Sequence, residues 1–524
     1  MLLVIADRIV TPAATGGDAV LVDDGRIAAV GWATDLRSKG REERSFPGAT
    51  IVSGLRDAHL HPVGYAASLA RPILKSAPDF DAIAQIVSEA ADRQPQGSAI
   101  TALRLDDESL AEGRLPTRDL LDRVAPDRPV LLVRYCGHVS VANTPALDLA
   151  GIGEETPDPP GGSYDRDGSG RLTGVLRETA ADPVTAAIRP LAPPITADDL
   201  IDALHALAST GLTGVGAMVA TDAGCWAGAG SELDALLEAA PRSPIDLGVL
   251  VIASSPGDLE SAAGRIAAAS GRICFVGVKM FSDGSLGGHT AAMHEGFADR
   301  PAERGIDRLD PARARRLAER SLALGGRVAI HAIGDRANGG VLDLMEGLIA
   351  GGADPADLRV EHASVLTEAD IARFGRLGVT ASVQPAFIAS ETGWLGKRLG
   401  PERLGRTYPF RSLAEAGAPL AGGSDSPVEP PHPLPGIAAA RDRCGIVPEE
   451  SLDAGAALAL FTTGAARAIG ADAELAPGAP ADLTVLPIDP LGAGPDELRT
   501  AEPIAVMVGG TEVERQPGRT AWVA

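Results

Sequence analysis

Six residues whose side chains suit divalent metal ions occur in a fixed order along this chain of 524 residues. They are His59 and His61 in DAHLHP, Lys279 in VKMFSDGS, His331 in VAIHAIGD, His362 in VEHAS, and Asp425 in GGSDSPV. Each lies at or just past the end of a short apolar run that is typical of a β-strand. Imidazole and carboxylate groups are common ligands for divalent ions. The set predicts a hydrolytic site with two metal ions.

The spacing of His59 and His61 favours joint binding. Residues two apart on a strand point to the same face, so both rings would aim at one ion. The alternative is a chance pair on a solvent loop. His331 and His362 follow consecutive predicted strands, and the alternative for each is a hydrogen-bonded structural histidine. Asp425 would bind one ion and take a proton from water, or else serve as a turn residue.

Lys279 is the unusual member of the set, because a protonated ammonium group cannot bind a cation. Burial near metal ions would remove its proton, and the neutral amine could then add carbon dioxide. The resulting carbamate would bridge two ions as a carboxylate does. The alternative is an ordinary lysine that forms an ion pair with Asp283.

The composition narrows the class of protein. The chain has a formal net charge of −23, which argues against nucleic acid or an anionic membrane as a partner. Its four cysteines fit no zinc or redox spacing. The first residues, MLLVIADRIV, suggest a strand rather than a signal peptide. We therefore expect a cytoplasmic enzyme that acts on a small-molecule substrate. A homo-oligomer is compatible with the sequence.

Strands and helices alternate through the middle of the chain, which predicts parallel pairing in a (β/α)8 TIM barrel. The expected strands are 49–54, 211–219, 245–252, 274–281, 326–332, 358–363, 379–385 and 418–425. Both ends contain short strands split by Gly and Pro. We expect residues 1–50 and 475–524 to form one small β-sandwich domain, and residues 51–474 to form the hydrolase barrel.

The stretch between the first two predicted strands is too long for an ordinary loop and must have structure of its own. We expect an inserted subdomain at about 72–180 over the barrel mouth. His138, Asn143 and Glu178 are its candidate pocket residues, and His289 is a further candidate substrate-binding residue in a later loop.

The motifs together resemble the amidohydrolase superfamily, and within it the amidohydrolase-3 group that includes N-substituted formamide deformylases. The resemblance rests on DAHLHP, VKMFSDGSLGGHTAAM, HAIGDRAN, VEHAS, SVQP and GGSDSPV, with GHVSVANTPAL, GVLRETA and LAPGAPADLTVL outside the metal motifs. It implies a binuclear metal barrel with a flanking β-sandwich, and a metal role for all six residues. At His289 the group often has a small or basic residue, so the substrate of a relative does not carry over directly.

These observations favour a metal-dependent amidohydrolase that cleaves a non-peptide C–N bond, of the amide, N-acyl or N-formyl kind, with a metal-bound hydroxide. Asp425 and Lys279 would be the catalytic residues. Two ions are expected, zinc first, although manganese or iron would accept the same ligands. An ester, a lactone or a deaminase-type substrate is the alternative for the same site. A non-catalytic oligomeric scaffold on this fold is the remaining alternative.

Overall fold

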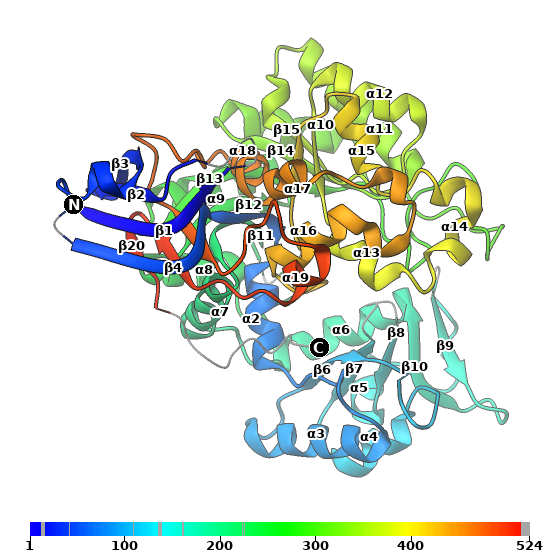
Figure 1. Cartoon of the computed structure of the whole chain (residues 1–524). Helices are drawn as coiled ribbons and strands as arrows, with labels where there is room; N and C mark the ends of the chain where they lie inside the picture. Colours follow the sequence, from blue (N-terminus) through cyan, green and yellow to red (C-terminus); the bar gives the residue numbers. More distant parts are fainter. Residues whose placement is uncertain are drawn as a thin grey trace. The chain divides into compact units, whose positions relative to one another are not determined.

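The computed structural model describes residues 1–11, 16–40, 42–107, 109–134, 139–159, 162–222, 224 and 226–514. The chain divides into two compact units, which we describe separately. Unit 1 comprises Met1–Pro62, Leu200–Thr221 and Leu236–Ala524, and unit 2 comprises Val63–Asp199 and Asp222–Ala235. Figure 1 shows the elements of both units in the colours of the sequence.

Unit 1 is built on eight parallel strands in the order β17-β16-β15-β14-β13-β12-β11-β5. Their bounds are β5 Leu55–Leu60, β11 Leu212–Ala220, β12 Asp246–Ile252, β13 Ile273–Phe281, β14 Arg327–Ala332, β15 Leu358–His362, β16 Thr380–Val383 and β17 Leu420–Gly422. The segment after β17 returns to β5, because the Asp425 amide donates to the His59 carbonyl at 2.7 Å. The His61 amide likewise donates to the Ser426 carbonyl at 2.8 Å. The predicted (β/α)8 barrel is confirmed.

The prediction of the first barrel strand was wrong, although the number of strands was right. Residues 49–53 belong to β4 (Glu42–Ser53), which pairs with β1 (Leu2–Val10) and β18 (Leu483–Leu486) outside the barrel. The barrel begins after Gly54 with β5, which is buried along its whole length. Arg56, Asp57 and His59 interrupt the apolar pattern of β5, so the sequence did not indicate a buried strand there.

Helices follow the strands and cover the barrel, as expected for βα units. Their bounds in unit 1 are α9 Pro256–Ala268, α10 Pro311–Ala323, α11 Asp335–Ala350, α12 Glu368–Leu377, α13 Ala386–Glu391, α14 Leu395–Leu404, α15 Phe410–Glu415, α16 Pro433–Asp442, α17 Ala454–Ala459, α18 Ala465–Ala468 and α19 Pro495–Thr500. Helices α7 (Ala197–Ser209) and α8 (Glu232–Ala239) each cross a boundary between the units.

The two ends of the chain build one β domain within unit 1, as the sequence predicts. Its seven strands are hydrogen-bonded in the order β20-β19-β18-β4-β1-β2-β3. The further strands are β2 Ala19–Asp23, β3 Arg26–Gly31, β19 Ala505–Val508 and β20 Thr511–Glu512, and α1 spans Ala33–Leu36. In Figure 1 the blue N-terminal strands and the red C-terminal strand lie in the same part of unit 1.

Buried polar groups join this sheet to the barrel. The Thr484 hydroxyl on β18 accepts from the Leu55 amide at 3.1 Å and donates to the Gly211 carbonyl at 2.8 Å. Arg56 on β5 forms an ion pair with Asp482 at 2.5 Å, and both side chains are buried. The C-terminal strands are thus linked to the first barrel strand through a buried charge pair.

Unit 2 contains a mixed five-stranded sheet in the order β6-β7-β8-β10-β9, with helices packed around it. Its elements are α2 Pro62–Ala70, α3 Phe80–Arg93, β6 Ile100–Leu105, α4 Arg118–Val124, β7 Val130–Arg134, β8 Val139–Ala142, α5 Thr144–Leu149, β9 Gly162–Arg166, β10 Leu172–Glu178 and α6 Asp182–Ile188. This is the inserted subdomain after the first barrel strand. Its bounds are wider than the predicted 72–180.

None of the described helices combines the length and the apolar character that crossing a membrane requires.

The buried pair of Arg56 and Asp482 gives a stability prediction. Asp482→Ala leaves the buried guanidinium without its nearest carboxylate, so we expect the free energy of unfolding to fall by about 3 kcal/mol. Glu43→Ala is the matched control, because it removes an exposed pair with Arg37 and should cost less than about 1 kcal/mol. Urea unfolding measures both. Equal losses in the two variants would contradict the structural role of the buried pair.

Candidate metal centre

Three of the predicted ligands meet at the carboxyl ends of β5 and β17. One ligand atom from each of His59, His61 and Asp425 lies within 4.8 Å of the others. His59 Nε2 is 3.3 Å and His61 Nε2 is 3.4 Å from Asp425 Oδ1. Two imidazoles and a carboxylate at this spacing match the donor set of a divalent ion.

The contact between β5 and the segment after β17 positions these three residues. One carboxylate oxygen of Asp57 accepts hydrogen bonds from the amides of His59 at 2.9 Å and Ser424 at 3.1 Å. Gly423 is required for this close approach, because a Cβ there would lie 2.8 Å from the His59 nitrogen. Asp57 and Gly423 therefore hold the His59–Asp425 contact in register.

A buried carboxylate orients the His59 ring. His59 Nδ1 is 2.5 Å from Glu361 Oε2, and Glu361 also accepts two hydrogen bonds from the Arg359 guanidinium. Burial acts to raise the pKa of Glu361, but Arg359 and His59 outweigh it and hold that pKa well below its ordinary value. An ionised Glu361 accepts from Nδ1–H, so the Nε2 lone pair of His59 faces Asp425 and is available to a metal ion.

The rings of His362 and His331 are likewise fixed by a hydrogen bond at one nitrogen. His362 Nδ1 is 2.7 Å from Gln384 Oε1, an arrangement that leaves Nε2 with a lone pair. His331 Nε2 is 2.9 Å from the Gly284 carbonyl, so Nδ1 is its free ligand atom. The two rings are 4.5 Å apart, and the His59 ring is 5.0 Å from that of His362. The four histidines therefore form one connected group.

The electrostatics of the group favours the forms that bind metal. Burial and the neighbouring His331 lower the pKa of His362 well below its ordinary value, so its ring is neutral. Burial acts to raise the pKa of Asp425, but His59 outweighs it and the pKa lies well below the usual range. Neutral imidazole and ionised carboxylate are the states that a divalent ion requires.

The backbone at two of these residues is strained. His362 has a φ of 73°, Ala363 a φ of 42° and Asp425 a φ of 56°. Residues other than glycine adopt this left-handed region at a cost, and they do so most often at functional sites. His362 is the last residue of β15, and Asp425 follows the end of β17 at Gly422.

Lys279 lies buried on β13, and its Nζ has no hydrogen-bond partner among the described residues. Burial lowers its pKa to about 8, although Glu361 and Asp425 act in the opposite direction. The amine is therefore neutral in an appreciable fraction of molecules near neutral pH. An unpaired neutral amine is the state from which a carbamate forms.

The alternative prediction for Lys279, an ion pair with Asp283, was wrong. Asp283 accepts hydrogen bonds from the amides of Ala292, Ile333 and Gly334 at 2.8–3.0 Å. No ion pair between Lys279 and Asp283 occurs in the described structure, and Asp283 instead lies 3.3 Å from His331 Nε2. Its role is to hold the loop after β13 against the end of β14.

Two of the predicted substrate residues are held by contacts within the protein, and the substrate role of His289 stays a prediction. Asn143 is buried, caps α5 by accepting from Ala146, and donates to the carbonyls of Ala125 and Arg128. It was misread because a cap and a binding amide look alike in sequence. His289 is buried with its ring edge against Phe297 and its Nε2 3.1 Å from Asp299.

The two other candidates cannot be placed in a site. His138 lies outside the described residues, and Glu178 ends β10 in unit 2 without a described side chain. Their proposed substrate role remains a prediction.

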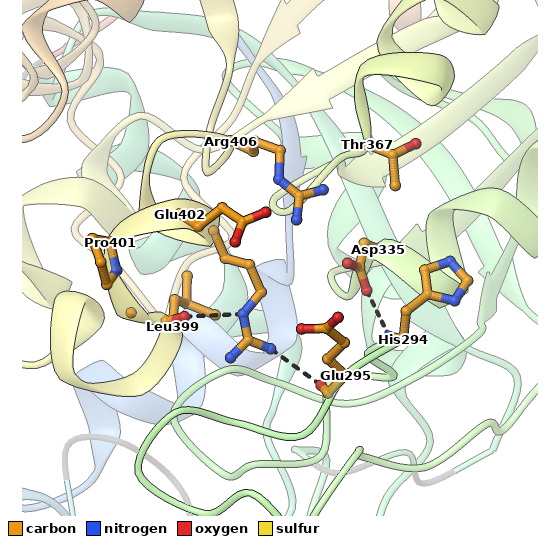
Figure 2. Close-up of a pocket in the computed structure, with 10 residues that line it drawn as sticks. His294, Glu295, Asp335, Thr367, Leu399, Pro401, Glu402 and Arg406 are labelled. Atoms are coloured by element: carbon orange, nitrogen blue, oxygen red, sulfur yellow. Dashed lines mark hydrogen bonds between the residues drawn. The ribbon is translucent and has the colours of Figure 1, made fainter.

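A cavity of about 400 Å³ lies elsewhere in unit 1, beside the starts of α11 and α12 (Figure 2). Its lining includes His294, Asp335, Arg403 and Arg406, and none of the six predicted ligands. The His294 amide donates to Asp335, and Arg403 donates to the carbonyls of Leu399 and Glu295. These polar groups thus form hydrogen bonds with neighbouring segments of the chain.

Sequence reasoning missed the residues that orient the ligands, namely Arg359, Glu361 and Gln384. A signal existed for Arg359 and Glu361. Two opposite charges inside the short buried strand LRVEH are rare unless they form an ion pair or belong to a functional site. For Gln384, in SVQP, no feature of the sequence indicated which histidine it would contact.

Comparisons with known proteins agree with this geometry. Residues 47–514 match the Amidohydrolase family, Amidohydro_3, and the chain belongs to it. It is 32% identical to the amidohydrolase YtcJ of Bacillus subtilis over 94% of this chain and 95% of that protein. It is 31% identical to an N-substituted formamide deformylase of Arthrobacter pascens, over 94% of each chain.

A solved structure supports the same assignment. A metal-dependent hydrolase from Pyrococcus furiosus superposes with a TM-score of 0.74 at 29% identity, over 94% of this chain and 99% of that one. The predicted family and fold are therefore confirmed, and the class of metal-dependent hydrolases follows.

The contact between Gln384 and His362 predicts an effect on metal affinity. Gln384→Met keeps the length of the side chain but removes the acceptor for Nδ1–H, so His362 loses its fixed orientation. We expect metal affinity to fall by about 10–100-fold, measured by competition with a chelator. His205→Gln, on α7, is the control and should leave the affinity unchanged. Unchanged affinity in Gln384→Met would show that Gln384 only fills space.

Proposed function

We propose that this protein is a metal-dependent amidohydrolase that cleaves a C–N bond outside peptides, in an amide, N-acyl or N-formyl compound. The observation that carries the proposal is the ligand geometry. Hydrogen bonds at the second nitrogen of His59, His331 and His362 leave one lone pair free on each ring. Asp425 and His61 complete a donor set typical of hydrolytic metal centres.

We infer that the predicted ligands would together hold two divalent ions. His59, His61 and Asp425 would hold one ion, His331 and His362 would contribute to holding the other, and Lys279, as a carbamate, would supply a further ligand. Ions bound there would lower the pKa of water and polarise the substrate carbonyl. Zinc is the first expectation, and manganese or iron suits the same ligands.

The residues of the chain would then carry the proton. Asp425 is ionised, and its Oδ1 would accept a proton from the attacking water. As the C–N bond breaks, the same carboxyl group would deliver that proton to the leaving nitrogen, so that an acid and an amine are released. Lys279 would take no proton in this scheme; its role is to hold the two ions.

Similarity to the deformylase supports a C–N bond as the bond that is cleaved, because the chain is 31% identical to that protein. The same site could also act on an ester or a lactone, because both present a carbonyl to the attacking water. A screen of the metal-loaded protein against N-formyl and N-acyl amines, matched esters and lactones tests the proposal. Release of amine that stops on chelation and returns with zinc supports it. Turnover of esters or lactones alone would contradict the C–N assignment.

Asp425→Asn tests the proton transfer. The variant keeps the size of the side chain but cannot accept a proton, so kcat should fall by about 10²–10⁴-fold. Metal content should stay near that of the wild type, because the other ligands remain. If Asp425 is only a turn residue, the variant will instead show a lower melting temperature with kcat almost unchanged.

Lys279→Ala tests the bridge between the ions. We expect loss of most activity together with loss of the more weakly held ion, as measured by the metal content per chain. A short carboxylate added to the buffer should restore part of the rate by taking the place of the carbamate. Lys397→Ala, at an exposed position, is the control. Full activity and full metal content in Lys279→Ala would contradict the bridging role.

A further inference from the structure

A small pocket of about 190 Å³ in unit 1 opens onto Lys279. It lies between the ends of β12 and β13 and the start of α10. Ile252, Phe281 and Leu317 contribute apolar walls, while Arg308 and Arg313 supply cations. The pocket thus joins a residue of the candidate metal centre to a positively charged entrance.

The Phe281 ring connects the two ends of the pocket. Lys279 Nζ is 4.7 Å from the centroid of this ring, and the Arg308 guanidinium carbon is 5.9 Å from the same centroid. One aromatic ring in the pocket lining is therefore close to both the Lys279 amine and the Arg308 guanidinium. A volume of about 190 Å³ is enough for a single ring or a short chain.

The charges at the entrance favour an anion. No carboxylate among the described residues forms an ion pair with Arg308, whose side chain is exposed. Arg313 donates to the Ser254 carbonyl, and Asp310 is engaged by the amides that begin α10. This local excess of positive charge occurs on a chain with a formal net charge of −23. The net negative charge of the chain would repel an acidic substrate. A guanidinium without a carboxylate partner at this entrance would attract it locally.

We propose that this pocket binds a compact apolar group that ends in a carboxylate, and that the substrates are N-acyl compounds carrying such an acidic group. The apolar part would lie against Phe281 and Leu317, and the carboxylate would pair with the planar fork of Arg308. The substrate assignment rests on the proposed function, whereas the binding of the acidic group by the pocket does not.

Binding to the metal-free protein tests the pocket by itself. Benzoate and its neutral counterpart benzamide are compared by saturation-transfer NMR, with metal removed so that a carboxylate cannot bind an ion. We expect benzoate to bind about 10-fold more tightly than benzamide, as a charge-assisted pair would provide. Arg308→Gln should abolish this preference and Arg308→Lys should keep part of it. The control Arg300→Gln, which removes another exposed guanidinium, should retain it in full.

Kinetics of the metal-loaded protein then tests the substrate class. Glutaryl-p-nitroanilide and valeryl-p-nitroanilide differ by a carboxylate in place of a methyl group at the far end. We expect the glutaryl compound to have the higher kcat/KM, mainly through a lower KM, and Arg308→Gln to remove the difference.

The outcomes separate the two proposals. Equal binding of benzoate and benzamide, or a preference unaffected by Arg308→Gln, overturns the pocket whatever the enzyme hydrolyses. Hydrolysis of neutral N-acyl amines without preference for acidic ones overturns the substrate class and leaves the proposed function standing. Selective benzoate binding without any C–N hydrolysis supports the pocket and overturns the proposed function.

Discussion

The buried Glu361 carboxylate is the interaction on which the candidate site depends. It accepts from Arg359 through both oxygens and lies 2.5 Å from His59 Nδ1, so it links β15 to β5 across the barrel. Arg359 also donates to the Ala58 carbonyl and to the Ser382 hydroxyl on β16. A buried ion pair contributes little to stability once desolvation is counted, but loss of one partner is costly. Its value here is that it fixes the direction of the His59 ring.

His59 and His362 differ in the charge of the side chain that holds each ring. His59 is held by an ionised carboxylate, whereas His362 is held by the neutral amide of Gln384. An anionic acceptor makes the opposite nitrogen of an imidazole more basic and a stronger ligand. On the proposed function, His59 should therefore bind a metal ion more tightly than His362 does. Lys279, buried between charged neighbours, is suited to supply a further ligand.

The sequence was sufficient for the barrel and the family because both depend on short-range patterns. Apolar strands alternate with helices, and the histidines occupy strand ends where parallel strands meet. The identity of the first strand could not be predicted, since β5 contains Arg56, Asp57 and His59 and its burial depends on partners far along the chain, such as Asp482. The tautomers likewise depend on contacts from distant residues, and the roles of Asn143 and Asp283 become clear only from their hydrogen bonds.

The central claim is that the six residues form one metal centre with two positions. Anomalous diffraction from crystals of the zinc-loaded protein, collected on both sides of the zinc absorption edge, tests it most directly. The account predicts two peaks per chain, a stronger one within bonding distance of His59, His61 and Asp425, and a weaker one at His331 and His362, with density for a carbamate on Lys279 between them. Peaks at other residues, with these side chains pointing apart, would contradict the account.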